Sequence, residues 1–438
     1  MFLHAGLDDT DSPDGMCTTY VGAVAIERAR AAGANLVGYP KLIRLNPCWP
    51  EKTRGNCAVA FLLDVPDDAV RRVKQVVLET VAELAEDHEG TNPGVAFYAG
   101  LQVPRALSEF ALRVVRDIVT IQEARELAAR VGAEIHEFRK GNGIIGALAA
   151  IGHPLDKDWT FELIAYRNPE NRSKVRHVDP ESVREMDRAT FPLTFDNLDP
   201  STGEIKITPH TPCPVLFGIR GESPEILEKA AAMLRVAEPI ERWIVYKTNQ
   251  ATDEHLIRAK ICEVKPLRSF SIHGFVSSKP RIIPGGHVIF RIRDETGELY
   301  CAAYEPTRNF RKTVMELAIG DEVIVHGSVK ERQGLPLTLN LEKLEILRLA
   351  NITVKVNPPC PSCGKRMKSM GRGRGYRCSR CNKKLPESGA EHVPVARKIS
   401  PGKFEVPPRA RRHLSKPLIR ELRGSAADGT FLSGTGQG

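Results

Sequence analysis

The sequence predicts an α+β multidomain protein, in which a mixed α/β N-terminal part is followed by a small β-barrel and a zinc ribbon. Three observations predict this architecture. The chain has 438 residues, and at about 100–200 residues per domain this length corresponds to about three domains. Two Cys-x-x-Cys pairs occur near the C-terminus, and the region before them consists of short runs of alternating apolar and polar residues. The first 260 residues mix strand-like and helix-like patterns.

The composition is that of a globular protein. Hydrophobic residues make up 42% of the chain and charged residues 27%, which is enough apolar content for real cores. No apolar run reaches the roughly 18 residues of a membrane span. The first residues, MFLHAGLDDTDSPDG, lack the basic and apolar regions of a signal peptide. We therefore expect a cytoplasmic protein that does not enter a membrane.

Positive charge is concentrated near the C-terminus. The whole chain carries a net charge of +9, whereas Ile352–Gly424 alone holds nineteen Lys and Arg residues against four Asp and Glu residues. The rest of the chain is therefore mildly acidic. A basic segment on an acidic body indicates that a polyanion such as nucleic acid binds at one end. A solvated tail without a partner is the alternative.

Four of the ten cysteines form a zinc-ligand pattern, namely Cys360, Cys363, Cys378 and Cys381. Each pair places two thiolates on one tight turn, and two such turns complete a tetrahedral shell. Four thiolates leave no open position, so the zinc would be structural. Lys and Arg residues surround Tyr376 between the pairs, which suits phosphate contacts and one stacked base, although an ordinary hydrophilic hairpin would have a similar sequence. The other six cysteines are expected to be small buried residues.

Residues 265–348 are expected to form a nucleic-acid-binding β-barrel of the OB type. Alternating runs between Phe270 and Leu347 are separated by turns such as Pro284-Gly285-Gly286. Five strands in about 80 residues fit a small Greek-key barrel, with a short helix expected at Val314–Ala318. OB barrels often bind oligonucleotides, although some bind sugars. The zinc ribbon and basic tail would follow at 352–423, and the small polar residues 424–438 are expected to be disordered.

The N-terminal part contains two sets of strand and helix patterns that are far apart in the chain. One set is Leu36–Leu45, Asn56–Val65 and a helix near Asp67–Asp87; the other is Val215–Gly221, Pro224–Val236 and Arg242–Lys247. Together they have the parts of a ferredoxin-like sandwich, which we assign to 34–90 and 196–260. The intervening stretch has its own patterns, so we expect one domain inserted into another. These intervening patterns are helices at Leu107–Ile118 and Ile121–Val131 and a strand at Ala133–Arg139.

An acidic cluster follows the first expected strand. The apolar segment FLHAGL runs directly into Asp8, Asp9 and Asp11. Three carboxylates so close together repel one another, and Mg²⁺ bridging to phosphate oxygens would relieve this repulsion. Thr18 lies in the first turn of the next expected helix, where free backbone N–H groups favour a phosphate. The alternative is an Asp-rich turn with Thr18 as the helix N-cap.

A glycine-rich turn is the second candidate phosphate site. It follows a strand-like segment and precedes a helical one, and its members are Arg139, Lys140, Gly141, Asn142, Gly143 and Gly146. Glycines allow a close approach to phosphates, and the helix start adds partial positive charge. Lys140 and Arg139 would supply charge to a transferring phosphoryl group. A single match to G-x-G-x-x-G is weak, so a plain strand–helix turn remains the alternative.

The combined features resemble the archaeal tRNA(Ile) 2-agmatinylcytidine synthetase family, TiaS. The resemblance rests on the head G-L-D-D-T-D-S-P-D-G-M-C-T-T, the K-G-N-G loop, the OB barrel and the zinc ribbon, which occur in one order over nearly the whole chain. It implies an ATP-dependent ligase that joins agmatine to the wobble cytidine of an isoleucine tRNA anticodon, so that the tRNA decodes AUA. Phosphorylation of the base carbonyl oxygen is implied as the activating step. A kinase-like ATP-binding domain is implied at 1–33 and 91–195.

The resemblance also implies roles for single residues. Asp8, Asp9 and Asp11 match carboxylates that bind Mg²⁺ and ATP, and Thr18 matches a phosphate acceptor. Lys140 with Gly141, Asn142 and Gly143 matches a phosphate-contacting loop. The agmatine guanidinium needs a carboxylate partner, and Asp196 and Asp199 are candidates.

Two other functions remain open on the sequence alone. A non-enzymatic protein that binds single-stranded nucleic acid would account for the barrel and ribbon, but it leaves the acidic cluster unexplained. A small-molecule kinase with an RNA-binding appendage would transfer phosphate without any tRNA.

Overall fold

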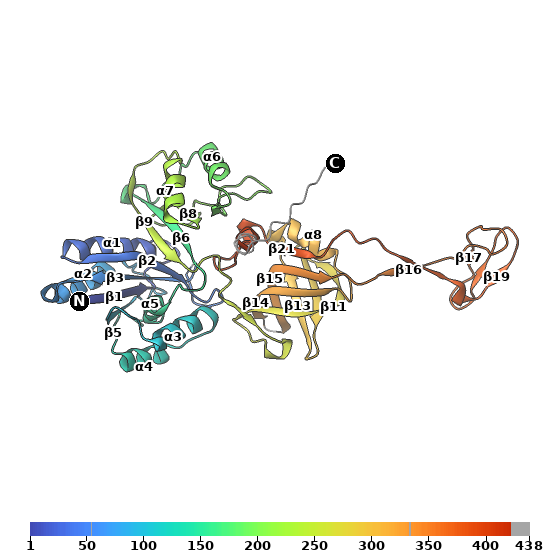
Figure 1. The fold of residues 1–438 in the computed structure, drawn as a ribbon, viewed down its shortest axis with the longest axis horizontal. Helices are drawn as coiled ribbons and strands as arrows, with labels where there is room; N and C mark the ends of the chain where they lie inside the picture. Colours follow the sequence, from blue (N-terminus) through green and yellow to red (C-terminus); the bar gives the residue numbers. More distant parts are fainter. Residues whose placement is uncertain (54, 333, 422–438) are drawn as a thin grey trace, which may run out of the picture.

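The computed structural model describes residues 1–53, 55–332 and 334–421, so the segment 424–438 predicted to be disordered lies outside the described residues. Figure 1 shows an α/β part, a barrel beside it and a small ribbon at the far end. In the described part of the chain, no helix is both long and apolar enough to span a membrane.

One mixed sheet organises the N-terminal part. Within the described residues it has nine strands in the order β5-β4-β1-β3-β2-β9-β6-β8-β7. The first strand, β1 (Phe2–Asp8), pairs antiparallel with both β3 (Cys57–Asp64) and β4 (Gly94–Ala99). A short parallel pairing between β2 (Asn35–Arg44) and β9 (Ile240–Thr248) joins the two halves of the sheet. The remaining strands are β5 (Glu134–Glu137), β6 (Thr160–Arg167), β7 (Thr194–Phe195) and β8 (Val215–Gly221).

Helices cover both faces of this sheet because its strands alternate apolar residues between two cores. Val59 and Phe61 of β3 face the core formed with α1 (Thr18–Ala31) and α2 (Val70–Leu84), whereas Ala58 and Ala60 face the opposite core. The opposite core is completed by α3 (Arg105–Arg116), α4 (Ile121–Val131) and α5 (Gly143–Gly152). The far end of the sheet has a separate core with α6 (Pro180–Thr190) and α7 (Pro224–Ala232).

The strand pairing groups the segments differently from the division inferred from sequence. Strands β2 and β3, assigned above to the ferredoxin-like segment 34–90, share a core with β1 and α1. Strand β6, assigned to 91–195, pairs with both β8 and β9. Sheet neighbours are fixed by hydrogen bonds between distant segments, so local patterns found the elements without showing how they pair.

Individual elements agree where local signals are strong. The predicted segments Ile121–Val131 and Val215–Gly221 coincide with α4 and β8. A capping box between Thr120 and Glu123 starts α4, and Gly132 in the left-handed conformation (φ 71°) ends it. Strands β4 and β6 and helix α6 were not predicted.

The expected OB barrel is confirmed. Its strands are β11 (Ser269–Ile283), β12 (His287–Arg293), β13 (Glu298–Ala303), β14 (Glu322–Arg332) and β15 (Leu335–Arg348). Antiparallel pairing of β11 with β14 closes the barrel, and β10 (Leu256–Arg258) adds to β11. Helix α8 (Asn309–Met315) begins five residues before the predicted Val314–Ala318 and buries Phe310 and Val314 in the barrel core.

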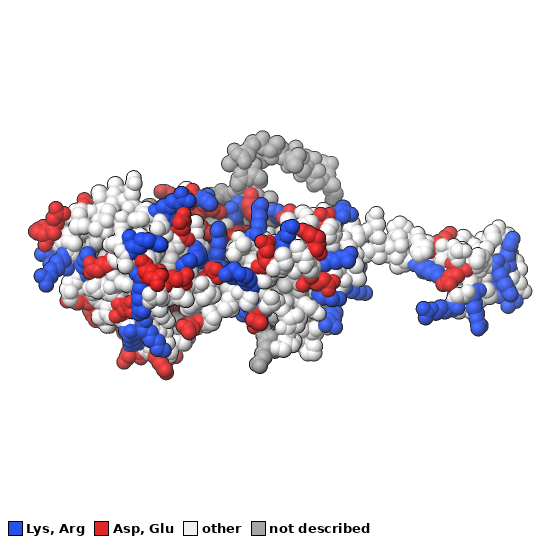
Figure 2. All heavy atoms as spheres, turned by 90° about the horizontal axis from the view of Figure 1, so that it is seen from below, with Lys and Arg blue, Asp and Glu red and all other residues white. Residues whose placement is uncertain are grey.

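The zinc ribbon is carried on a two-stranded stalk. Strands β16 (Thr353–Val356) and β20 (Glu391–Pro394) form the stalk, and β17 (Lys368–Ser369), β18 (Tyr376–Arg377) and β19 (Lys384–Leu385) form the ribbon. Figure 1 shows the ribbon standing away from the barrel, and Figure 2 shows Lys and Arg side chains on it. The chain then returns through β21 (Gly402–Glu405), which pairs with β15. Residues 406–421, here called the C-terminal strap, continue back to the nine-stranded sheet.

The prediction of a basic tail needs correction in the strap. Arg411 pairs with Asp196, and Arg420 pairs with Asp158 and Glu222. The side chains of both arginines are only 5% exposed. The charge count alone treated these residues as free to meet nucleic acid, but their charges are already paired within the protein.

Candidate functional site

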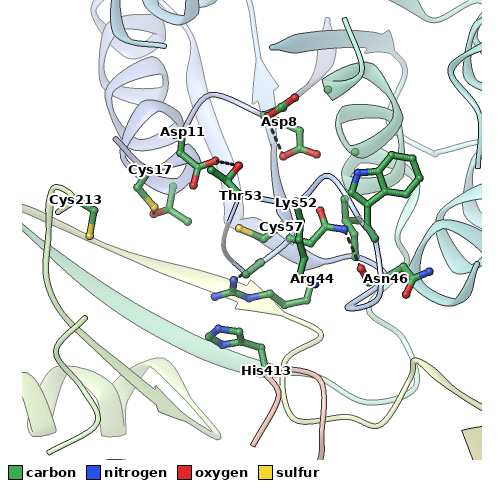
Figure 3. A pocket seen from close by; sticks show the side chains of 18 of the residues that line it. Asp8, Asp11, Cys17, Arg44, Asn46, Lys52, Thr53, Cys57, Cys213 and His413 are labelled. Carbon is green, nitrogen blue, oxygen red and sulfur yellow. Dashed lines mark hydrogen bonds between the residues drawn. The ribbon is translucent and has the colours of Figure 1, made fainter. Parts of the chain in front are cut away.

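A cavity of about 440 Å³ lies where the carboxyl end of β1 meets the ends of β2 and β3 and the start of α5. Asp8, Asp9 and Asp11 form an acidic edge of this cavity. Figure 3 shows Asp8 and Asp11 on one side and Arg44 and His413 on the other. The cavity therefore offers opposite charges on facing walls.

Asp8 is held tightly against the start of α5. A Cβ atom on Gly146 would lie 1.9 Å from Asp8 Oδ2, and one on Gly143 would lie 2.6 Å from the Asp8 backbone oxygen. Only glycine allows this approach. The partial positive charge of the α5 N-terminus consequently lies beside the acidic edge, while its first N–H groups, those of Gly143 and Ile144, donate to the Asn92 and Gly141 backbone oxygens.

The carboxyl groups of this edge are poorly compensated. Burial, then the neighbouring charge of Asp9, raises the pKa of Asp8 well above its usual value. Burial also raises the pKa of Asp9 to about 6, although the Asn92 backbone N–H donates to its Oδ2 at 3.0 Å. Asp9 itself adopts a left-handed backbone (φ 58°), which is costly for a non-glycine residue. A bound cation would stabilise both groups in the ionised form.

The carboxylate oxygens of the acidic edge are suitable ligands for a hard cation, but they are not close enough together to enclose one. Magnesium prefers oxygen ligands, often from one or two carboxylates plus substrate phosphates. Of the described residues, only the four ribbon cysteines place three or more ligand atoms within 4.8 Å of one another. Asp8, Asp9 and Asp11 would thus share an ion with phosphate oxygens or water, rather than enclose it by themselves.

The structure brings some of the predicted site residues together and separates others. Asn142, Gly143 and Gly146 line the cavity with the three aspartates. Arg139, Lys140 and Gly141 do not line it. The Arg139 guanidinium donates to the backbone oxygens of His88 (2.6 Å) and Thr91 (2.9 Å) and pairs with Asp87, while Lys140 is exposed.

Thr18 also lies off the cavity. Its side chain is at the start of α1 in a residue only 3% exposed, and its Oγ1 accepts a hydrogen bond from the Thr10 hydroxyl at 3.2 Å. Cys17, with an extended backbone, is the N-cap residue of α1. The alternative role of Thr18 as N-cap is therefore wrong.

The basic wall was missed in the sequence. It comprises Arg44, Lys52, Lys206, Arg220 and His413. Arg44 donates to the Gly55 backbone oxygen at 2.7 Å, and Glu162 lies 3.7 Å from Arg44 and 3.4 Å from Arg220. Arg44 and Arg220 lie near the ends of separate strands, Lys52 and Lys206 lie in loops, and His413 lies on the strap. No local motif therefore marks them.

The two candidate partners for agmatine lie elsewhere. Asp196 is paired with Arg411. Asp199 is fully buried, and its Oδ1 accepts hydrogen bonds from the backbone and hydroxyl of Ser201. Neither residue lines the cavity.

The four cysteines of the ribbon converge as predicted. Their Sγ atoms lie 3.3 Å apart for Cys360–Cys381 and 3.5 Å apart for Cys363–Cys378, close to the ~3.8 Å edge of a tetrahedron with Zn–S bonds of about 2.3 Å. Both knuckles turn through a left-handed residue directly after the second cysteine, Gly364 (φ 69°) and Asn382 (φ 59°). The thiolates fit a structural Zn²⁺.

Comparisons with protein families match the chain in four places. The TiaS TCKD domain matches residues 4–65, and the TiaS FLD domain matches 141–255. An OB-fold nucleic acid binding domain matches 270–347, and the TiaS C-terminal zinc ribbon domain matches 357–399. These matches agree with the barrel and ribbon described above.

Whole-chain relatives and solved structures point the same way. The isoleucine tRNA 2-agmatinylcytidine synthetase TiaS of Pyrococcus horikoshii is 48% identical over 96% of this chain and 97% of its own, and that of Archaeoglobus fulgidus is 46% identical over 96% and 98%. A solved complex of TiaS with its isoleucine tRNA and ATP superposes with a TM-score of 0.88 at 45% sequence identity. A solved complex with the tRNA, AMPCPP and agmatine superposes with a TM-score of 0.85 at 43% sequence identity. Each superposition covers 96% of this chain and 97% of the solved chain. The chain therefore belongs to the isoleucine tRNA 2-agmatinylcytidine synthetase family, TiaS.

Proposed function

We propose that this chain is an ATP-dependent ligase that joins agmatine to the wobble cytidine of an isoleucine tRNA. Relatives that are 40–48% identical over nearly the whole chain carry the synthetase name. Similar solved structures contain an isoleucine tRNA, ATP or AMPCPP, and agmatine. The observation that carries the proposal is the cavity at the end of β1, where an acidic edge faces a basic wall. A protein that only binds single strands is not favoured, because it gives no role to this cavity.

The reaction requires activation of a poor electrophile. A phosphoryl group from ATP moves to the carbonyl oxygen of the cytosine ring. The primary amine of agmatine then attacks the ring carbon that carries this oxygen. The C–O bond breaks, and the oxygen leaves with the phosphate. The base gains agmatine and loses one oxygen, while the released proton passes to solvent or phosphate.

Basic and acidic residues of this chain have different roles in this reaction. Arg44, Lys52 and Arg220 would attract phosphate oxygens from the basic wall, and the partial positive charge at the start of α5 lies beside the same space. Asp8 and Asp9 would hold Mg²⁺, which when bound neutralises negative charge on the phosphates. The OB barrel and the zinc ribbon would hold the tRNA by its shape and backbone.

Two roles carried over from the family require movement in this chain. Phosphate acceptance by Thr18 would require the turn that holds Thr10 to open, because its hydroxyl is buried. Phosphate contact by Lys140 would require its side chain to turn toward the cavity, which it does not line. Because the substrate is a tRNA, we place the reaction in the cytoplasm.

Mass spectrometry of nucleosides tests the proposal. The full-length protein is incubated with an isoleucine tRNA bearing a wobble C, ATP, Mg²⁺ and agmatine, and each component is omitted in turn. A cytidine heavier by agmatine minus water, absent without ATP, is the expected product. Tight binding of a tRNA that stays unmodified would refute the ligase and favour the single-strand-binding alternative. Phosphate transfer without tRNA would favour a small-molecule kinase.

A further inference from the structure

The C-terminal strap follows the zinc ribbon in the sequence and returns to the cavity at His413. The Ala251 backbone N–H donates to the His413 oxygen at 2.8 Å, and those of Thr252 and Asp253 donate to the Leu414 oxygen at 3.1 and 2.8 Å. Leu414 is 1% exposed and belongs to the core with α3 and α5. These contacts hold the backbone at His413 and Leu414, and within the described strap His413 alone lines the cavity.

His413 Nδ1 has two polar neighbours. Arg220 Nη2 lies 2.9 Å from it and Gln250 Oε1 lies 3.2 Å from it. A guanidinium can only donate, so the shorter contact is a hydrogen bond in the tautomer whose ring proton is on Nε2 and whose Nδ1 accepts. Burial, followed by the charges of Arg44 and Arg220, holds the pKa of His413 well below its usual value. The imidazole is therefore neutral near pH 7.

Arg220 is held by two acceptors. Its Nε lies 3.4 Å from Glu162 Oε1, and its Nη2 donates to His413. Glu162 also faces Arg44 and accepts a hydrogen bond from Gln250, so one carboxylate serves two guanidinium groups. The wall keeps an excess of positive charge, which is the chemistry that binds a phosphate group.

We propose that His413 is a positioning residue, which holds the Arg220 guanidinium beside Arg44 so that the pair can bind a phosphate group. This proposal rests on the proposed function, since it places that phosphate on ATP or on the backbone of the anticodon. It gives the strap a role beyond packing. The neighbouring Arg411, Arg412 and Arg420 pair with carboxylates of the barrel and sheet, whereas His413 acts on a cavity residue.

Variants of the full-length protein test this role. His413→Ala removes the acceptor, whereas His413→Asn keeps an acceptor oxygen at about the position of Nδ1. We expect His413→Ala to lower kcat/KM for ATP at least tenfold and His413→Asn to stay within threefold of the parent. If the phosphate belongs to the tRNA backbone, the tRNA Kd rises by the same factor instead. Arg409→Ala is the matched strap control, because Arg409 only approaches Glu204 at 4.0 Å, and it should change neither quantity more than twofold.

A double-mutant cycle separates positioning from a general structural effect. If His413 acts through Arg220, His413→Ala adds less than a twofold loss in an Arg220→Ala background. Multiplying losses would overturn the proposal, as would a folded His413→Ala protein that keeps kcat/KM and the tRNA Kd within twofold. Zinc content and thermal midpoint report folding, and calorimetric binding of AMPCPP needs no agmatidine formation. An inactive parent that binds AMPCPP would thus refute the ligase while leaving the role of His413 testable.

Discussion

Gly146→Ala should inactivate the protein without unfolding it. The new Cβ would lie 1.9 Å from Asp8 Oδ2, whereas ordinary contact begins at 3.4 Å, so the carboxylate must move by about 1.5 Å. A misplacement of about 1 Å can cost a reaction on the order of 100-fold. We therefore expect the single-turnover rate of agmatidine formation to fall by about 100-fold or more.

The stability of this variant should change little. Alanine favours a helix interior over glycine by about 1 kcal/mol. Asp8 is poorly compensated where it lies, since burial and Asp9 raise its pKa, so moving its carboxyl group outward removes an unfavourable contact. The free energy of unfolding should consequently stay within about 1 kcal/mol of the parent, as measured by urea denaturation.

Gly152→Ala is the contrasting variant at the other end of α5. Its Cβ would lie 2.3 Å from the Leu107 backbone oxygen, and a backbone atom in a packed helix pair cannot swing away. This variant should lose stability, while Gly146→Ala keeps it. A Gly146→Ala protein that retains more than a tenth of the parent rate would refute the close Asp8–α5 contact as the source of the requirement.

Three further perturbations follow from the same contacts. Asp9→Asn should abolish agmatidine formation and leave the tRNA affinity unchanged. Because the folded pKa of Asp9 is about 6 against a usual value of 3.8, the parent loses stability as the pH rises through this window, so in urea melts without ligand the variant should gain up to about 3 kcal/mol of stability relative to the parent between pH 4 and 7. A stability difference that stays constant with pH would contradict the burial of Asp9. Cys378→Ser should lose zinc and weaken tRNA binding on the order of tenfold, about 1.4 kcal/mol, while AMPCPP binding persists; an unchanged filter-binding Kd would exclude the ribbon from tRNA recognition. Arg420→Met should cost about 1–3 kcal/mol of unfolding free energy, because Glu222 and the Ala251 and Trp159 backbone oxygens lose their donor, while Asp158 keeps its pair with Lys416. Lys403→Met, in an exposed pair with Glu421, should cost less than about 1 kcal/mol.

The parts of the protein that the sequence predicts well are those with local causes. The cysteine spacing predicts the knuckles, since each knuckle depends on a few consecutive residues. The structure confirms that the four cysteines converge. The alternation in 270–347 predicts the barrel, most of whose paired strands are consecutive along the chain; the exceptions are the β13–β15 pair and the closing β11–β14 pair. The acidic head and Gly143–Gly146 also lie together, because β1 ends where α5 begins.

Features that depend on long-range pairing were beyond the sequence patterns. The β2–β9 junction joins residues about two hundred positions apart through two pairs, Lys41–Lys247 and Leu42–Thr248, and nothing local marks it. Arg44, Arg220 and His413 come together from three distant segments. Arg139 and Lys140 carried a suitable motif, yet the left-handed turn at Arg139 (φ 57°) directs its guanidinium to backbone oxygens instead.

The path of the chain explains how one polypeptide can carry a protruding ribbon and still complete a distant cavity. The base of the stalk is closed by the Val395 backbone N–H, which donates to the Ile352 oxygen at 2.8 Å. Arg397 then donates to Asp321 and to the Ala350 oxygen, so the returning chain is tied to the barrel where it left. The stalk and ribbon therefore leave and rejoin the barrel at adjacent points. Because β21 and the paired arginines anchor the strap before and after His413, the OB barrel and the basic wall of the cavity are joined by a short, fixed segment.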